Sequence, residues 1–353
     1  MGWSENGFRA RANSARKSEI FGTIENRRFS VHRDKVPIAP RQSLDGTLER
    51  AERVRMDPVT HGLMGFFIAL FVAKKLGFED IKWPLVAGAV SALISDIDTF
   101  SFFFGESGFY TYHRVATHSF IGIILLALII AIFFSRLKKH EFIRYFPLAM
   151  LGLLSHLFLD FVTAAQGVQI FYPFSTARVA LNISPGVDIY LLAIFAAGIF
   201  VYKLHPKEHQ KIAATVLLFV FLLFSVRFAA TNYAETRVGA LNGNSFLAPS
   251  LFNPFKWNVV KEHESGYLLS EYAFLLGMSE PEYFKMKDDP IVLASMKSDL
   301  VGSFLKFARF PYPVVDGASV EWVDMKPSGS RGGFTATVTL DENFNIIREE
   351  MGI

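Results

Sequence analysis

Two ionisable side chains lie inside one of the most apolar stretches of the chain. His156 and Asp160 fall in the sequence LLSHLFLD at residues 153–160. Residues four apart on an α-helix project from the same face, so these two side chains are expected to point at a common object. A neutral imidazole and a carboxylate are both ligands of zinc, manganese and iron. The pair predicts part of a metal site, and a hydrogen-bonded pair that holds helices together is the alternative.

Further ionisable residues occur at the ends of other apolar stretches. Each of these residues also has a purely structural interpretation. An aspartate can terminate a helix or face the helix dipole, and a loop arginine can have no role other than to neutralise nearby acids. Ionisable groups near hydrocarbon are costly unless they are paired or functional. The set therefore favours a metal site. Its candidate ligands are His61 in PVTHG, Asp96 in SDID, His113 and His118 in HRVATHS, and His156 and Asp160; Asp98, Arg114 and Asp188 lie in the same motifs or in PGVD.

The apolar stretches have the length of membrane spans. Runs of about 17–25 apolar residues match the thickness of the hydrocarbon layer, and the 353-residue chain is 51% hydrophobic with 37 phenylalanines. The second and fourth stretches contain acids and small residues, so they are expected inside the bundle. Six spans are predicted, at approximately 59–76, 84–104, 116–135, 143–162, 187–203 and 212–230.

The order of the spans places the ionisable residues at one end of the bundle. The candidate residues open odd-numbered spans or close even-numbered spans, and these ends lie on one face of the membrane. Ten lysines and arginines occupy the loops at the opposite face, whereas only Arg114 and Arg178 occupy the loops beside the candidate ligands. The positive-inside rule then predicts a multi-pass protein of a prokaryotic inner or plasma membrane. The site and the C-terminal region are expected on its extracytoplasmic side.

The regions that flank the spans differ from them. Residues 1–55 hold 12 Lys+Arg and 7 Asp+Glu without an apolar core, so they are expected to form a disordered basic extension, with Met56 as the working start. Residues 231–353 are acidic, with 11 Lys+Arg and 16 Asp+Glu. Alternating β-branched and aromatic residues in WNVVKE, GYLLSEYAF, VEWVDM and FTATVTLD predict antiparallel strands, and the pattern at 290–307 predicts a helix.

These patterns define the predicted fold class. It is an all-α polytopic membrane bundle of about six transmembrane helices at residues 56–230, followed by a small soluble α+β domain at 231–353. The chain has no cysteine, which excludes disulfides, thiolate catalysis and cysteine-ligated zinc. No basic stripe runs through a folded segment, so nucleic acid is not an expected partner. Membrane lipid and a small-molecule or lipid-linked substrate are expected.

The motifs resemble those of the YdjM/YbcI family of membrane-bound metal-dependent hydrolases, also named DUF457. PVTHG, SDID, HRVATHS and SHLFLD carry the resemblance over roughly residues 56–205, with YPF at 172–174, PGVD at 185–188 and a tail like that of the longer members. A looser similarity reaches zinc-dependent phospholipase C and the P1-type nucleases. It implies that His156 and Asp160 act as a ligand pair, with Asp96, His61 and His118 as further ligands. No clear second His-x-x-x-Glu follows the fourth span, so one or two metals are expected.

The function predicted from these residues is that of a membrane-bound metal-dependent hydrolase. Zinc is the first choice of cofactor, with manganese or iron as alternatives, and metal-activated water would be the nucleophile. Asp96 or Asp98 is predicted as a bridging ligand or general base, and Arg114 as the binder of an anionic group such as phosphate. A phosphoester or lipid-linked substrate fits a site at headgroup depth. The alternative is a non-enzymatic membrane adaptor or metal-ion carrier, although a carrier needs ionisable residues along a path through the bilayer.

Overall fold

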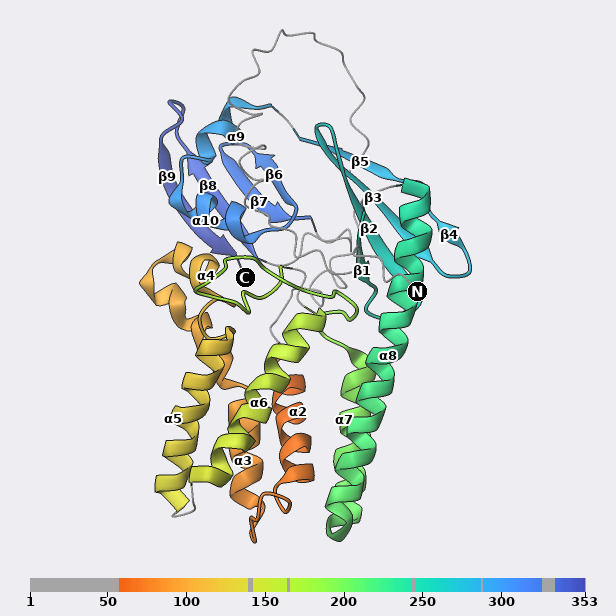
Figure 1. Ribbon diagram of the computed structural model, residues 1–353. Coiled ribbons are helices and arrows are strands. Elements are labelled where there is room, and N and C mark those ends of the chain that lie inside the picture. The colour runs from red at the N-terminus through yellow and green to blue at the C-terminus, as the bar shows by residue number, and fades with distance from the viewer. Residues whose placement is uncertain are drawn as a thin grey trace.

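A helical bundle forms one end of the molecule and a β-rich domain forms the other (Figure 1). The computed structural model describes residues 57–138, 142–163, 166–242, 245–286, 288–325 and 334–352. The predictions for residues 1–55 and for Met56 lie outside the described residues.

Six helices of the bundle run along one another (Figure 1). Two short segments, the 3-10 helix η1 (Ile94–Phe104) and α4 (Glu106–Tyr112), connect the second of these helices to the third, and the 3-10 helix η2 (Pro206–Glu208) precedes the last. The six are α2 (Pro58–Val72), α3 (Lys82–Ser91), α5 (Phe120–Lys138), α6 (Phe142–Thr163), α7 (Ile189–Leu204) and α8 (His209–Asn242).

Three helices within the described residues are long and apolar enough to cross a membrane. They cover Phe120–Leu137, Phe142–Thr163 and Pro206–Gly239, while α2 and α7 are shorter apolar helices. The described residues thus contain three candidate spans, and the predicted number of six is not shown. The predicted second span, 84–104, is not one helix, because the backbone tightens at its middle: the Leu93 N–H donates to Val90 O at 3.0 Å and the Asp96 N–H to Leu93 O at 3.2 Å. These three-residue hydrogen bonds begin η1.

Small residues allow α3 to pack closely against both α2 and α6. A Cβ atom on Gly65 would lie 2.3 Å from the carbonyl oxygen of Gly88, and one on Gly152 would lie 2.6 Å from Ser91 Cβ. The three backbones therefore approach closely, as small residues permit in membrane bundles. This packing brings the start of α2, the end of α3 and the second half of α6 to one level.

The helices differ in how much of their surface the protein covers. In α6, 56% of the apolar window is buried, which agrees with its predicted interior position, against 28% in α5 and 28% in α8. Large apolar side chains remain open on α5, including Ile129 at 63% and Phe133 at 59% exposure. An apolar surface of this kind fits contact with lipid.

The C-terminal domain contains two antiparallel sheets, as the alternating sequence patterns predicted in outline. The first has the order β1-β2-β3-β4, with β5 also paired to β3, and the second has the order β6-β7-β8-β9. The strands are β1 (Phe246–Pro249), β2 (Lys256–His263), β3 (Gly266–Ala273), β4 (Gly277–Met278), β5 (Glu282–Lys285), β6 (Pro311–Asp316), β7 (Ser319–Asp324), β8 (Thr335–Leu340) and β9 (Ile346–Gly352).

Two boundaries differ from the sequence expectation. The helix predicted at 290–307 is divided into α9 (Pro290–Ser295) and α10 (Asp299–Phe307), because Ser298 has an extended backbone and its Oγ accepts the Val301 N–H at 3.1 Å as an N-cap. The predicted domain boundary after residue 230 falls inside α8, which continues to Asn242.

The C-terminal domain rests on the short helix α4. Phe109 is fully buried and its ring lies 4.7 Å from that of Phe334, which directly precedes β8. The Tyr110 hydroxyl donates to Thr335 O at 2.7 Å, and Phe109 and Tyr110 belong to the same apolar cluster as residues of α10. The second sheet therefore holds α4, and with it the chain that leads into α5.

Candidate metal centre

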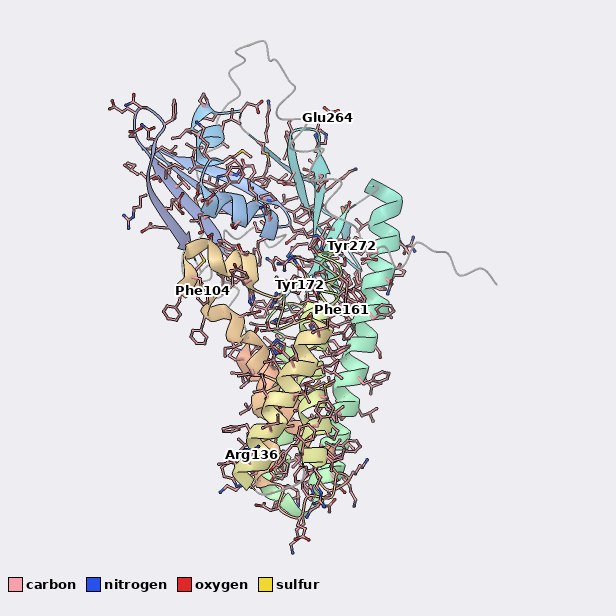
Figure 2. The ribbon with its side chains drawn as sticks, turned by 60° about the vertical axis from the view of Figure 1, so that its left-hand side comes forward. Phe104, Arg136, Phe161, Tyr172, Glu264 and Tyr272 are labelled. Carbon is pink, nitrogen blue, oxygen red and sulfur yellow. The ribbon has the colours of Figure 1, made fainter. Side chains whose placement is uncertain are left out.

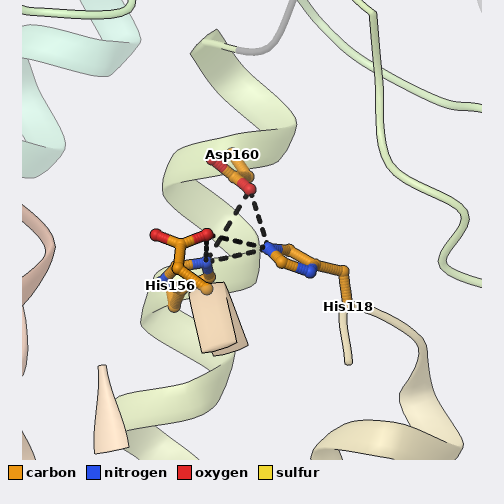
Figure 3. A group of neighbouring side chains, drawn as sticks. His118, His156 and Asp160 are labelled. Carbon is orange, nitrogen blue, oxygen red and sulfur yellow. Dashed lines mark hydrogen bonds and ion pairs between the residues drawn. The ribbon is translucent and has the colours of Figure 1, made fainter. Parts of the chain in front are cut away.

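Helix α6 delivers two of the candidate ligands to the buried end of the bundle. His156 and Asp160 are 0% and 2% exposed. They lie on consecutive turns of one face, as the four-residue spacing predicted, and Asp160 Oδ2 lies 3.7 Å from His156 Nε2. Figure 3 shows both side chains directed toward the ring of His118, which approaches from the start of α5.

Four side chains from three segments converge here. Asp96 on η1 joins His118, His156 and Asp160, and one donor atom from each lies within 4.8 Å of all the others. His118 Nε2 lies 3.0 Å from His156 Nε2 and 3.1 Å from Asp160 Oδ2. Asp96 Oδ1 lies 3.5 Å from each of the two Nε2 atoms. Ligands about 2.0–2.2 Å from a tetrahedral zinc lie roughly 3.3–3.6 Å from one another, so the spacing suits one small cation.

The hydrogen bonds of the two imidazoles fix which nitrogen faces this point. His156 Nδ1 lies 2.7 Å from Ala92 O, and His118 Nδ1 lies 3.0 Å from Thr117 Oγ1 and 3.2 Å from Asp98 Oδ2. The carbonyl can only accept, and the Thr117 hydroxyl donates its own proton to Asp98, so both Nδ1 atoms carry a proton. The two Nε2 atoms face each other at 3.0 Å. This orientation of the rings is that of metal-ligating histidines.

His61, at the start of α2, provides a fifth donor. Its Nδ1 lies 2.8 Å from Asp57 O, which assigns the ring proton to Nδ1. Its Nε2 lies 3.6 Å from Asp160 Oδ1 and is buried without a hydrogen-bond partner among the described residues. His61 therefore shows the same tautomer as His118 and His156.

Asp98 lies behind the ring of His118. Its carboxylate accepts the Arg114 N–H at 2.9 Å and the Thr117 hydroxyl at 2.7 Å, and one oxygen lies 2.8 Å from His113 Nδ1. With His118 Nδ1 also in contact, these partners occupy both oxygens of Asp98. Its position is that of a group that orients histidines.

His113 lies close to the centre but is not one of the four convergent donors. Its ring is fully buried and stacks on Phe109 at 4.6 Å. Burial lowers the pKa of His113, and the hydrogen bond with Asp98 does not reverse the shift. Asp96, Asp98 and His113 form a second group whose donor atoms can hold a cation.

Arg114 is directed at Asp160. Its terminal nitrogen donates to Asp160 Oδ1 at 3.0 Å, and its Nε lies 3.0 Å from Asp160 Oδ2, so the two side chains form an ion pair. The backbone of Arg114 has a φ of 59°, a left-handed conformation that turns the chain between α4 and α5. The anion-binding role predicted for Arg114 stays a prediction, because in this structure a protein carboxylate occupies the guanidinium.

Asp188 lies apart from the centre. It caps α7, where its Oδ1 accepts the Tyr190 N–H at 3.0 Å, and its Oδ2 lies 3.0 Å from an Arg227 nitrogen. Both residues are 2% exposed. The helix-capping alternative therefore describes Asp188. The Arg227 partner escaped the sequence analysis, although a lone arginine inside an apolar span was a signal for a buried acid.

Arg178 is a second cation that sequence reasoning did not assign. Its guanidinium donates to Gly167 O at 3.2 Å and to His113 O at 3.4 Å. Burial, together with the positive charge of Arg114, lowers its pKa to about 10, so it remains protonated at neutral pH. It ties the loop after α6 to the segment that carries His113.

The chain matches the family model described as YdjM inner membrane protein over residues 56–234, which is about half of its length. It belongs to the YdjM inner membrane protein family. All the candidate ligands of this YdjM-family chain lie within the matched region, and the family description agrees with its apolar helices. No curated protein and no solved structure matches the chain. The similarity to zinc-dependent phospholipase C and P1-type nucleases stays a prediction.

Proposed function

We propose that this protein is a membrane-bound metal-dependent hydrolase. One observation carries the proposal: the Nε2 atoms of His118 and His156 face each other at 3.0 Å, with two carboxylates beside them. The Nδ1 atoms of both rings are directed at protein oxygens, as they are in metal-ligating histidines. Two histidines and two aspartates form a ligand set suited to zinc, with manganese or iron as alternatives.

The arrangement supports hydrolysis of an ester. A divalent cation in this centre would supply a hydroxide nucleophile at neutral pH, by lowering the pKa of water. In the reaction, water oxygen joins the phosphorus or carbonyl carbon, the ester bond breaks, and the leaving alcohol takes up a proton. Asp96 is the proposed proton acceptor, because its side chain is 19% exposed while those of His118 and Asp160 are 0% and 2% exposed. Asp98 and Arg114 are proposed to orient His118 and Asp160.

The proposed substrate is a phosphoester or a lipid-linked molecule at the extracytoplasmic face of the cell membrane. The centre lies at the end of the bundle where the C-terminal domain packs, and the lysine-rich loops lie at the other end (Figure 1). If α2, the α3–η1 segment and α7 also cross the membrane, the chain has six spans. The positive-inside rule then predicts that the lysine-rich loops lie in the cytoplasm. The rival metal-ion carrier has less support, because the described candidate ligands gather at one level, and metal content separates the rival adaptor from the hydrolase.

Elemental analysis of detergent-purified protein tests the proposal. We expect about one or two equivalents of a divalent metal in the wild type and a large loss in His156→Ala, since removing one ligand weakens binding strongly. His263→Ala, at the exposed end of β2, is the matched control and should keep its metal. Metal-dependent cleavage of bis(p-nitrophenyl) phosphate should follow the same order. A His156→Ala protein with full metal content would overturn the proposal.

A further inference from the structure

The segment that carries Asp96 has three distinct faces. A 3-10 helix has about three residues per turn, so residues three apart lie on one face. One face of η1 is buried and polar, another carries Asp96, which faces the centre, and the third is apolar and open. The buried face consists of Ser95, Asp98 and Ser101, and the open face consists of Ile97, Phe100 and Phe103.

The open face of η1 is strongly exposed. Ile97, Phe100 and Phe103 are 50%, 58% and 74% exposed, and the neighbouring Phe104 is 84% exposed. Figure 2 shows Phe104 projecting from the flank of the molecule, between the bundle and the C-terminal domain. A contiguous aromatic surface of this kind marks a contact with a partner or a membrane rather than with water.

The surroundings of η1 identify the partner as lipid. Helix α5 contacts η1 and also has exposed apolar side chains at its start, where Phe120 and Ile124 are 47% and 45% exposed. Phe120 also contacts Phe171, which is 52% exposed, with ring centroids 5.9 Å apart. Aromatic side chains concentrate where a membrane protein meets the headgroup layer. The open face of η1 therefore lies beside a helix that is long and apolar enough to span the hydrocarbon.

We propose that the open face of η1 lies among the lipids of the leaflet nearest the metal centre, and that the substrate is an amphiphile that arrives from this leaflet. Its apolar part would lie against Ile97, Phe100 and Phe103 while its ester headgroup reaches Asp96 on the adjacent face. Asp96 is the most exposed of the four convergent ligands, so the approach over η1 leads to the accessible side of the centre. The substrate class rests on the proposed hydrolase function, whereas the lipid contact does not.

Spin labels test the lipid contact without any measure of activity. The chain contains no cysteine, so single cysteines at Phe100 and Phe103 can be labelled specifically. Collision of each label with oxygen, which dissolves in lipid, and with nickel-EDDA, which stays in water, would be measured in liposomes. Ile129→Cys on α5 is the lipid reference and Leu293→Cys on α9, 52% exposed, is the water reference. We expect the oxygen-to-nickel ratio at Phe100 and Phe103 to exceed that at Leu293 severalfold. A ratio equal to that at Leu293, or protection from both reagents by a second copy or another segment, overturns the proposal.

A second measurement tests the substrate class. A Phe100→Ser, Phe103→Ser variant would be compared with the wild type on a fluorogenic phospholipid in vesicles and on water-soluble bis(p-nitrophenyl) phosphate. We expect vesicle cleavage to fall about tenfold or more relative to cleavage of the soluble ester, because apolar contact with the substrate is lost. Phe344→Ser in the C-terminal domain is the control for an exposed phenylalanine. Equal loss on both substrates, or a wild type that cleaves only the soluble ester, overturns the amphiphile assignment. A wild type that cleaves neither ester overturns the hydrolase function, and the spin labels still decide the lipid contact.

Discussion

His118 and His156 are held in the same tautomer by acceptors of different charge. His156 donates to the neutral carbonyl of Ala92, whereas His118 Nδ1 lies 3.0 Å from the Thr117 hydroxyl and 3.2 Å from the Asp98 carboxylate. A charged acceptor makes the opposite nitrogen of the ring a better metal ligand than a neutral acceptor does. The two imidazoles are therefore expected to differ in strength as metal ligands, and a substitution of Asp98 should change that difference.

Asp98→Asn should weaken metal binding without removing a ligand. The amide keeps the shape of the carboxylate but removes the charge behind His118, so the dissociation constant for zinc should rise about 10- to 100-fold. Saturating metal should still restore the wild-type stoichiometry. Competition with a chelator measures the constant, and Asp316→Asn, on an exposed position of β6, is the control. An unchanged constant would show that Asp98 does not tune His118.

Asp160→Asn should have the larger effect, because an amide is a much poorer ligand for a divalent cation than a carboxylate. Bound metal, measured by elemental analysis, should fall to background while the protein still inserts and folds. Arg114→Gln tests whether metal binding depends on the ion pair between Arg114 and Asp160. It removes that ion pair, at 3.0 Å, but keeps the Asp160 carboxylate, so the variant should retain its metal. Full metal content in Asp160→Asn would identify the pair with His156 as a helix–helix contact.

The sequence was sufficient to find most of the convergent side chains. Residue types and the order of the spans brought His61, Asp96, His118, His156 and Asp160 to one level, and the structure places them together. The partners of Asp98 and Arg114 were not predictable, because they depend on the turn of η1 and on the left-handed backbone at residue 114. Both are features of the backbone conformation, and the spacing of residues in the sequence does not predict them.

At the level of elements, the largest departure from the sequence expectation is the division of the second span into α3 and η1. Hydropathy responds to the apolar content of 84–104 but not to its hydrogen-bond pattern, so it cannot distinguish an α-helix from a 3-10 helix. The tighter turn matters for the site: it places Asp96 and Asp98 on adjacent faces, where one approaches the ligand cluster and the other approaches His113. The strands were predicted from the alternation of their side chains, and the long helices from the length of their apolar runs.

Gly65→Ala should loosen the packing of α2 on α3. The added Cβ would lie 2.3 Å from Gly88 O and 2.5 Å from Ala92 Cβ, so the backbones must separate. Overpacking of this kind costs about 1–3 kcal/mol, and the separation also displaces His61 from Asp160. We expect a lower unfolding temperature in detergent, followed by tryptophan fluorescence, together with reduced metal content. Gly239→Ala on α8, where a Cβ meets nothing within 4 Å, is the matched control. Equal stability of the two variants would contradict the close-packing account.

At the scale of the whole molecule, the metal centre and the C-terminal domain occupy the same end of the bundle (Figure 1). The contacts of α4 with β8 and α10 require this arrangement irrespective of how the protein lies in the membrane. The charge bias of the loops predicts that this end lies on the extracytoplasmic side.

Cysteine labelling in intact cells tests this orientation. Cysteines would be placed singly at Glu264, in the exposed β2–β3 turn, and at Lys207, in the exposed loop between α7 and α8. An impermeant maleimide should label the cysteine at 264 directly and the cysteine at 207 only after the membrane is opened. The reverse pattern would invert the topology and place the centre in the cytoplasm.

The contact of Phe334 with Phe109 imposes an order on biosynthesis. Every candidate ligand lies before residue 161, whereas Phe334 is synthesised after all six helices of the bundle. Membrane helices insert as they emerge, so the candidate ligands reach the bilayer while β8 is still unmade. Until that strand is made, Phe109 lacks its contact with Phe334, and the ring of His113 stacks on a side chain that is not yet fully packed. The surroundings of His113 and of its bond to Asp98 are therefore completed only after the C-terminal domain has been synthesised.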